Sequence, residues 1–281
     1  MRSDNGPVVS VVVPHRGNDD SLFLCVNAVR SQVLAYHSVE LIIVLNEPKK
    51  RPLGFDLRDH ETLLWEPQYF SYNARNTGIR AATGGVIALT DSDSVPEPLW
   101  LENALGHVSR GAQLVAGRIM LTFPTGPLSA PACYEKLYAF DQEKNVRFGR
   151  STTANLVGPS DLFTKFPFET DAATGEDFRW TTQAVATGVT LTYAEEAVVR
   201  HPVRESMGEL LAKAERVTRR QGNSRSGKMG IIPAFRHYFS VHCVPPSASR
   251  RRECSSREKF LASFTSILLQ GAKLWFFLRP R

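Results

Sequence analysis

The chain has 281 residues, of which 42% are apolar and 22% are charged, and this composition excludes disordered, fibrous and low-complexity proteins. Its length suits one large α/β domain, or one domain with an appended segment. Four cysteines stand far apart without a Cys-x-x-Cys pair, so neither a zinc ribbon nor a disulfide scaffold is expected. The opening residues hold no apolar run of the secretory type, and we expect a cytoplasmic protein.

The net charge of +6 combines two parts of opposite sign. Residues 1–199 hold 17 lysines and arginines against 23 acidic residues, a net charge of −6. Residues 200–281 hold 17 against 5, a net charge of +12. An acidic body can hold a metal ion, whereas a basic tail can face phosphate in a nucleic acid, an anionic lipid or a pyrophosphate-bearing substrate.

The first ninety residues alternate between apolar runs and helical patterns. Continuous apolar runs predict buried strands at 8–13, 39–45, 62–65 and 86–90. Apolar residues at helical spacing predict a helix over 21–34, and 71–82 is expected to be a helix that ends near Gly84 and Gly85. This alternation is typical of a doubly wound sheet, which binds ligands outside the carboxyl ends of its strands. Pro14, Asn46 and Asp91 all lie at such ends.

The rest of the chain has a weaker pattern. We expect further helices over 99–109 and 177–187, and further strands over 113–123 and 189–194. Residues 124–153 are irregular and are interpreted as a loop over a site. Residues 154–170 alternate small, apolar and turn residues. Beyond residue 202 we expect a basic amphipathic helix, a basic linker and a final helix at 206–221, 245–257 and 258–278.

Three short motifs carry side chains suited to chemistry. Asp91 and Asp93 follow the strand at 86–90, and two carboxylates at a strand end offer the hard oxygen ligands that suit Mg²⁺ or Mn²⁺. Glu176 and Asp177 begin a predicted helix, where a carboxylate beside a cleft can act as a general base. His201 follows the strand at 189–194.

Each motif alone also has a common structural explanation. Paired aspartates often lie in solvated turns, and acidic residues in a first helical turn usually complement the helix dipole. A lone histidine near a strand end is more often structural than a ligand. The order of the three motifs along the chain is what favours a shared site.

Several segments resemble, in the same order, the motifs of the family-2 glycosyltransferases with the GT-A fold. VVSVVVPHRGN and VELIIVLN are similar to the first two strands of that family, and ARNTGIRAATGGVIALTDSDSVPEP is similar to its Arg-Asn-x-Gly helix and metal motif. Further matches follow in the family's order, namely Asn155, Phe163, Phe166, Phe168, GEDFRW and AVVRHP. The resemblance covers roughly residues 8–202.

The resemblance implies a GT-A fold, a Rossmann-like and mostly parallel sheet flanked by helices. It also implies an inverting transfer of a sugar from a nucleoside-diphosphate sugar to an acceptor hydroxyl, and the expected donor is a UDP-sugar. Asp93 and His201 would ligate Mn²⁺ or Mg²⁺, Asp177 would be the general base, and Glu176 would contact sugar or acceptor. The donor nucleotide would be bound by Pro14, Arg16, Asn46, Arg75, Asp91 and Ser92.

The same resemblance sets the expected domains and partners. It implies a catalytic domain over 1–202 and leaves a basic helical extension over 203–281. No Gln-x-x-Arg-Trp sequence of the processive members is present, which favours transfer of a single sugar. The acceptor would be a glycan or a lipid-linked molecule, and no nucleic-acid partner is expected because the tail has no clear nucleic-acid module.

The final segment, 259–278, is long enough to span a membrane, but its polar residues make spanning costly. Five polar residues fall on one helix face, namely Lys259, Ser263, Ser266, Gln270 and Lys273. We therefore expect an interfacial helix and a peripheral, anionic-membrane contact through residues 245–281. Its headgroup contacts would be Arg250, Arg251, Arg252, Arg257, Arg279 and Arg281. The alternative is a helix packed on the catalytic domain or in an oligomer contact.

Two other functions are compatible with parts of the sequence. A sugar-phosphate nucleotidyltransferase has a similar sheet, but it needs a Gly-rich, basic loop after the first strand, and PHRGNDD is not one. A non-catalytic basic protein that binds membrane or nucleic acid would explain the tail but not the acidic motifs.

Overall fold

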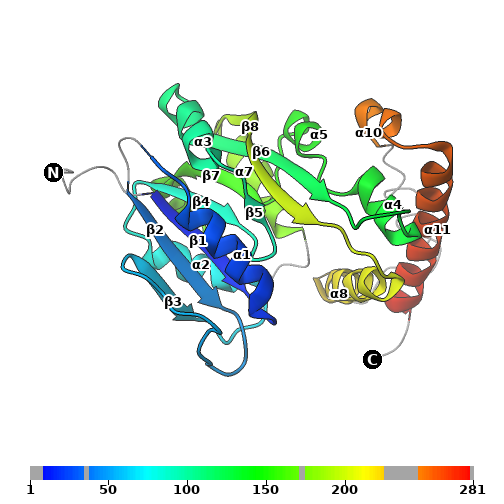
Figure 1. Ribbon diagram of the computed structural model, residues 1–281, viewed down its shortest axis with the longest axis horizontal. Coiled ribbons are helices and arrows are strands. Elements are labelled where there is room, and N and C mark those ends of the chain that lie inside the picture. Colours follow the sequence, from blue (N-terminus) through cyan, green and yellow to red (C-terminus); the bar gives the residue numbers. More distant parts are fainter. Residues whose placement is uncertain (1–8, 35–37, 171–174, 225–245, 279–281) are drawn as a thin grey trace. The chain divides into compact units, whose positions relative to one another are not determined.

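The computed structural model describes residues 9–34, 38–170, 175–224 and 246–278 (Figure 1). Contacts between Cα atoms divide the chain into two compact units. Unit 1 comprises Met1–Met120, Gln142–Thr170 and Glu176–His201, and unit 2 comprises Leu121–Asp141, Asp171–Gly175 and Pro202–Arg281. Residues 121–141, which lie before the boundary expected at residue 202, thus cluster with the C-terminal segment.

Unit 1 is built on a mixed sheet with the strand order β3-β2-β1-β4-β7-β6-β8-β5. The strands are β1 Val9–His15, β2 Val39–Leu45, β3 Glu61–Trp65, β4 Val86–Thr90, β5 Val95–Pro96, β6 Leu114–Thr122, β7 Asn155–Pro159 and β8 Leu191–Pro202. The first four in the order pair in parallel, with Val9 opposite both Val39 and Val86. The pairs β4–β7, β7–β6 and β8–β5 are antiparallel.

The helices of unit 1 are α1 Asp19–Arg30, α2 Ser71–Ala81, α3 Trp100–Ser109, α5 Gln142–Arg147, α6 Ser160–Lys165 and α7 Glu176–Ala186. The chain crosses from β1 to β2 through α1 and returns from β3 to β4 through α2. Right-handed crossovers in these two opposite directions place the two helices on opposite faces of the sheet. Figure 1 shows α1 in front of the parallel strands and α2 behind them. The expected doubly wound, Rossmann-like fold is confirmed.

An aromatic stack fixes the start of α7 against the core of unit 1. The ring of Trp180 lies 5.0 Å from that of Phe163 and 5.1 Å from that of Phe168, measured between centroids. All three side chains are buried, and the Trp180 Nε1 donates to the carbonyl of Phe166. Because buried aromatic pairs stabilise beyond their area, this stack holds the first turn of α7, which carries Glu176 and Asp177.

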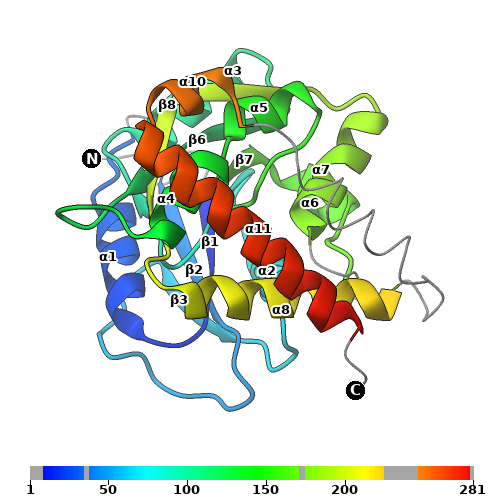
Figure 2. The ribbon, with the colours of Figure 1, turned by 90° about the vertical axis from the view of Figure 1, so that its right-hand side faces the viewer.

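Unit 2 contains the helices α4 Ala130–Tyr138, α8 Met207–Ser224, α10 Ala248–Arg252 and α11 Ser256–Leu278. Within it α11 packs along α4 and α8 (Figure 2). Ala262 joins a cluster with Cys133 and Leu137 of α4, and Leu269 joins one with Leu210 of α8. By length and composition, the stretch Ser256–Phe277 of α11 could also cross a membrane.

The strands and helices expected before residue 124 are confirmed within a few residues, and so are those at α7, α8, α11 and the start of β8. The interpretation of 124–153 as irregular is wrong, because α4 and α5 lie there. The Ser129 side chain accepts from the amide of Ala132, and Pro131 occupies the first turn, where its missing N–H costs nothing. Residues 154–170 form β7 and α6, and the expected linker 245–257 includes α10. Residue 245, Cys243, Arg279 and Arg281 lie outside the described residues.

Candidate active site

Two carboxylates and an imidazole come together at the carboxyl end of β4. Asp91 and Asp93 lie in the turn that follows Thr90, closed by a hydrogen bond from the Ser94 amide to the Asp91 carbonyl. Because β8 pairs antiparallel with β5, placing Arg200 opposite Val95, the buried His201 comes next to this turn. The His201 Nε2 lies 3.4 Å from the Asp93 Oδ1.

This cluster suits a divalent cation. One ligand atom from each of Asp91, Asp93 and His201 lies within 4.8 Å of the others. Two carboxylate oxygens placed this closely repel each other unless a cation lies between them. Carboxylates favour Mg²⁺ and Mn²⁺, and an imidazole nitrogen adds a ligand that Mn²⁺ accepts more readily than Mg²⁺. The residues present therefore fit the expected metal.

Arg75 holds one of these carboxylates in place. Arg75 lies on α2, is buried, and donates from Nη2 to the Asp91 Oδ1 at 2.5 Å. Its Nε is buried and has no hydrogen-bond partner in the part of the chain that the structure describes. Since the guanidinium cannot lose its charge, it offsets part of the negative charge that Asp91 and Asp93 gather at the strand end.

Asp177 is a half-buried carboxylate that interacts electrostatically with Arg75 and Asp91. It occupies the first turn of α7, and its Oδ1 accepts from the Phe178 amide at 2.9 Å. Burial raises its pKa, the charge of Arg75 opposes that rise, and the charge of Asp91 adds to it. A carboxylate whose pKa is raised toward neutrality is a stronger proton acceptor than one in water.

The neighbouring carboxylate, Glu176, is turned into the protein. It is buried, and its Oε1 accepts from the Glu169 amide at 2.8 Å. Burial raises the pKa of Glu176 as well. Its other oxygen has no hydrogen-bond partner among the described residues. A contact of Glu176 with sugar or acceptor stays a prediction, while its described contact ties α7 to the end of the preceding segment.

The residues predicted to bind the donor nucleotide lie at the same edge of the sheet. Pro14 is buried in β1 opposite Val44, and Ser92 is half-buried between the two aspartates. Asn46 is buried, and its amide group donates to the carbonyls of Glu66 and Gln68 and accepts from the Phe70 amide. Asn46 thus shapes the loop after β3.

The same loop carries the partner of Arg16. The guanidinium of the exposed Arg16 lies over the ring of Tyr69, 4.2 Å from its centroid. Asn46 fixes the backbone on both sides of Tyr69, since it bonds Gln68 and Phe70. Arg16 and Asn46, which follow different strands, therefore meet at one loop, as the positions of their strand ends predict.

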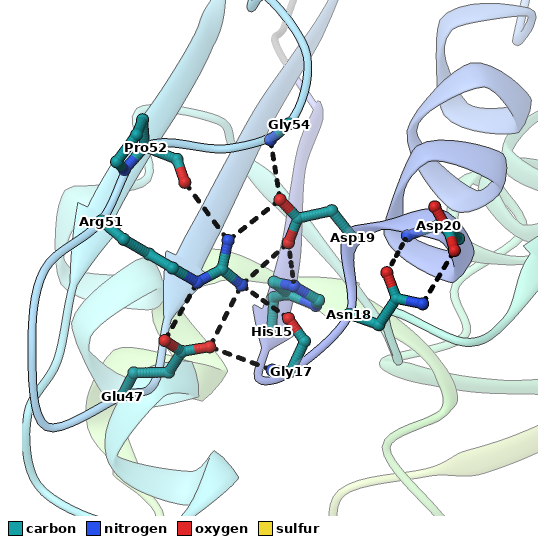
Figure 3. A network of polar contacts seen from close by, with 9 residues as sticks. All are labelled: His15, Gly17, Asn18, Asp19, Asp20, Glu47, Arg51, Pro52 and Gly54. Atoms are coloured by element: carbon teal, nitrogen blue, oxygen red, sulfur yellow. Dashed lines mark hydrogen bonds and ion pairs between the residues drawn. The ribbon is translucent and has the colours of Figure 1, made fainter.

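A second polar network at this edge has no counterpart in the sequence-based predictions (Figure 3). Arg51 donates to both oxygens of Asp19, to Glu47 and to the Gly17 carbonyl. The Glu47 carboxylate in turn accepts from the Gly17 amide. The network joins the loops that follow β1 and β2, and its hydrogen bonds from Arg51 hold the pKa of Asp19 and of Glu47 below their ordinary values.

The buried His15 lies under this network. Its Nε2 is 2.9 Å from the Asp19 Oδ1, and burial lowers its pKa, so it is neutral at pH 7. No motif or periodicity connects His15, Asp19, Glu47 and Arg51 in the sequence. Paired charges after successive strands of a parallel sheet are the one signal that could have found them.

The chain matches the model of glycosyl transferase family 2 over residues 10–169, and it belongs to this family. It is a glycosyltransferase with the GT-A fold, as the sequence motifs predict. The nucleotidyltransferase and the non-catalytic alternatives are thereby set aside. The matched range includes Arg75, Asp91 and Asp93 and ends before Asp177 and His201.

Three known proteins are similar to this chain. The chain is 31% identical to glycosyltransferase AglE of Haloferax volcanii over 224 residues, which cover 76% of this chain and 73% of AglE. It is 29% identical over 231 residues to pre-mycofactocin glycosyltransferase of Mycobacterium tuberculosis and spans about half of that protein, 75% of this chain and 47% of the other. The solved mannosyltransferase PcManGT from Pyrobaculum calidifontis, in complex with GDP-Man and Mn²⁺, matches with a TM-score of 0.56 at 15% identity, over 97% of this chain and 86% of that one.

Proposed function

We propose that this glycosyltransferase moves one sugar from a nucleoside-diphosphate sugar to an acceptor hydroxyl, with inversion at the anomeric carbon and with Asp177 as the general base. The observation that carries the proposal is the cluster of Asp91, Asp93 and His201 at the carboxyl end of β4, electrostatically coupled to the half-buried Asp177. A structural neighbour solved with GDP-Man and Mn²⁺ supports the donor class and the metal.

Asp93 and His201 would hold the metal, with Asp91 as a third ligand or as a contact to the ribose. Bound there, Mn²⁺ or Mg²⁺ would neutralise the diphosphate that leaves. Arg75 orients Asp91 through its 2.5 Å hydrogen bond. Arg16, Asn46, Pro14 and Ser92 lie at the same edge, where the nucleotide of the donor would bind.

Asp177 would take the proton of the acceptor hydroxyl as its oxygen forms the new bond to the anomeric carbon. The bond from that carbon to the diphosphate oxygen breaks at the same time, and its electron pair leaves with the diphosphate. Attack from the face opposite the leaving group inverts the anomeric centre. The raised pKa of Asp177 favours this proton transfer.

The chemistry is assigned to residues 1–202, and the acceptor is a glycan or a lipid-linked molecule. We expect the donor to be a UDP-sugar, although the structural neighbour was solved with GDP-Man. A panel of UDP-, GDP- and other nucleotide sugars is therefore the right screen. The readout is the nucleoside diphosphate released in the presence of MnCl₂, with EDTA as the reference.

The deciding experiment compares Asp177→Asn with Asp161→Asn. Asp161 is the matched control, because it also begins a helix and its Oδ1 accepts from the next amide, at 2.8 Å, but it is exposed. We expect Asp177→Asn to lose transfer while it still binds nucleotide and Mn²⁺, and Asp161→Asn to keep both. Full transfer by Asp177→Asn would refute the assignment of the base.

A further inference from the structure

Helix α11 buries several small or polar side chains and exposes several of its large apolar ones. Its buried residues include Ala262, which packs on α4, Leu269, which packs on α8, and the polar Thr265 and Gln270. Its exposed side carries five large apolar residues, called here the apolar stripe: Phe260, Phe264, Ile267, Leu268 and Trp275. Soluble helices show the opposite distribution. Of the expected polar face, Gln270 is buried, whereas Lys259 and Ser263 are exposed.

The stripe is continuous along the helix. Successive members are separated by 4, 3, 1 and 7 residues, a spacing that keeps them on one side of a helix. The gap before Trp275 is filled by the exposed Gly271. Phe260 is 70% exposed, and Ile267 and Trp275 are each 62% exposed. An apolar face of this extent marks a binding surface rather than ordinary scatter.

The face of α11 opposite the apolar stripe is covered by protein, so α11 does not span a membrane in the described structure. It packs on α4 and α8, and α4 contributes Lys136, which pairs with Glu258 of α11 at 2.8 Å. Arg250 of α10 also donates to the carbonyls of Lys136 and Phe140, which fixes α10 beside α4. A helix whose one side packs on other helices of the same protein can enter a bilayer only with its other side.

Exposed cations gather at the N-terminal end of the stripe. This basic end consists of Arg251, Arg252, Arg257 and Lys259, all exposed. Of the two nearby acids, Glu258 is engaged by Lys136, and Glu253 is exposed. The basic end therefore carries a net positive charge next to an apolar surface, which complements anionic headgroups above an acyl region.

We propose that the apolar stripe and the basic end form a docking surface for an anionic lipid bilayer, with α11 lying in the plane of the interface. The stripe enters the boundary between headgroups and acyl chains, and the basic end contacts the headgroups. This surface does not depend on the proposed sugar transfer, and its occupant is lipid rather than a second copy of the chain.

The test is flotation of the full chain with vesicles of phosphatidylcholine mixed with phosphatidylglycerol, compared with phosphatidylcholine alone. We expect binding to the anionic vesicles and a loss of about tenfold or more in Ile267→Glu. The matched control is Leu24→Glu, because Leu24 is a 58% exposed apolar residue on α1 of unit 1. It should bind as the unchanged protein does.

Two further measurements test the basic end and the apolar stripe separately. Neutralising Arg251, Arg252 and Arg257 to Gln should weaken binding to anionic vesicles by about fivefold per arginine, with no effect on neutral vesicles. Anionic vesicles should also blue-shift the fluorescence of Trp275, and Trp275→Phe should remove that shift. The proposal is overturned if vesicles do not bind the protein, if Ile267→Glu binds normally, or if sedimentation shows a dimer through the stripe instead.

Discussion

The Arg51 guanidinium donates two parallel hydrogen bonds to the carboxylate of Asp19, at 2.9 and 2.8 Å, and so fastens the loop after β2 to the start of α1. The same Asp19 carboxylate accepts from the Gly54 amide and contacts the buried His15 (Figure 3). Bidentate pairs of this kind define a geometry as well as supplying energy. The loop after β2 and the start of α1 lie at the sheet edge where we propose that the nucleotide binds.

Replacing Arg51 by Met should therefore lower the free energy of unfolding. The change leaves Asp19 and Glu47 without their cation, and we expect a loss of roughly 2 kcal/mol. Urea unfolding at pH 7 measures it. Lys50→Met is the control, since Lys50 is the adjacent exposed cation, and it should lie within about 0.5 kcal/mol of the unchanged protein. Equal losses in both variants would contradict the role of the network.

The pH dependence of that difference has a definite sign. Arg51 lowers the folded-state pKa of Asp19 and Glu47, so their contribution is present above their unfolded pKa and is lost as the pH falls through the folded one. The gap between the unchanged protein and Arg51→Met should therefore narrow below about pH 4. If the difference in free energy of unfolding between the two proteins stayed constant on acidification, the loss of stability in Arg51→Met would not be electrostatic.

The sequence is most informative where one residue pattern decides the structure. Buried parallel strands need continuous apolar runs, and β2 and β4 match their predicted bounds, 39–45 and 86–90. β7 is different, because its sequence begins with a buried asparagine and contains Gly158. A Cβ at Gly158 would lie 2.8 Å from the Gln113 carbonyl, so glycine is set there by tertiary packing that no local pattern shows.

Pairings between distant residues limit the prediction of the site in the same way. Asp91, Asp93 and His201 could be proposed as a group because each follows a recognisable strand. Arg51 lies in the loop after β2, 32 residues from Asp19 at the start of α1, and periodicity carries no information about their contact. On α11 the helix itself was predictable, but which side is buried depends on α4 and α8, and only the fold decides that.

Removing the imidazole from the metal cluster should weaken metal binding. His201→Gln should reduce the affinity for Mn²⁺ at least by the roughly 10–100-fold that loss of an outer-shell partner costs. Electron paramagnetic resonance of free Mn²⁺ during a titration of EDTA-treated protein gives the affinity. His107→Gln is the matched control, because His107 does not belong to the cluster. Its Nε2 pairs with the Glu196 Oε1 at 2.7 Å. Retained Mn²⁺ affinity in His201→Gln would remove His201 from the metal site.

Asp177→Asn should stabilise the protein at pH 7 while it abolishes transfer. Burial raises the pKa of Asp177 in the folded state, so burying its ionised carboxylate lowers the free energy of unfolding at pH 7. The neutral amide of Asn does not carry this desolvation penalty. The expected gain is roughly 0.5–2 kcal/mol, as at other active sites that sacrifice stability for activity. The gain should vanish at low pH, where Asp177 is protonated in the unchanged protein. Thermal unfolding across pH measures it, and a destabilised variant at pH 7 would contradict the origin of the raised pKa.

The stability of unit 2 should depend on one fully buried carboxylate. Glu135 of α4 accepts from the Arg204 side chain at 2.7 Å and from its amide at 2.8 Å, and Lys213 of α8 lies 3.5 Å away. Breaking a buried ion pair from one side costs several kcal/mol because the remaining charges lose their partner, so Glu135→Gln should cost roughly 3 kcal/mol.

The matched control for Glu135→Gln is Glu143→Gln. Glu143 pairs with Arg147 one helical turn away on an exposed surface, where the same substitution should cost about 0.5 kcal/mol or less. Thermal unfolding of the full chain compares the two. The apolar stripe of α11 rests on α4 and α8, so Glu135→Gln should also weaken flotation with anionic vesicles at temperatures where unit 2 begins to unfold. If the two variants unfold alike, the buried cluster does not hold α4 to α8, and the stripe is supported by apolar packing alone.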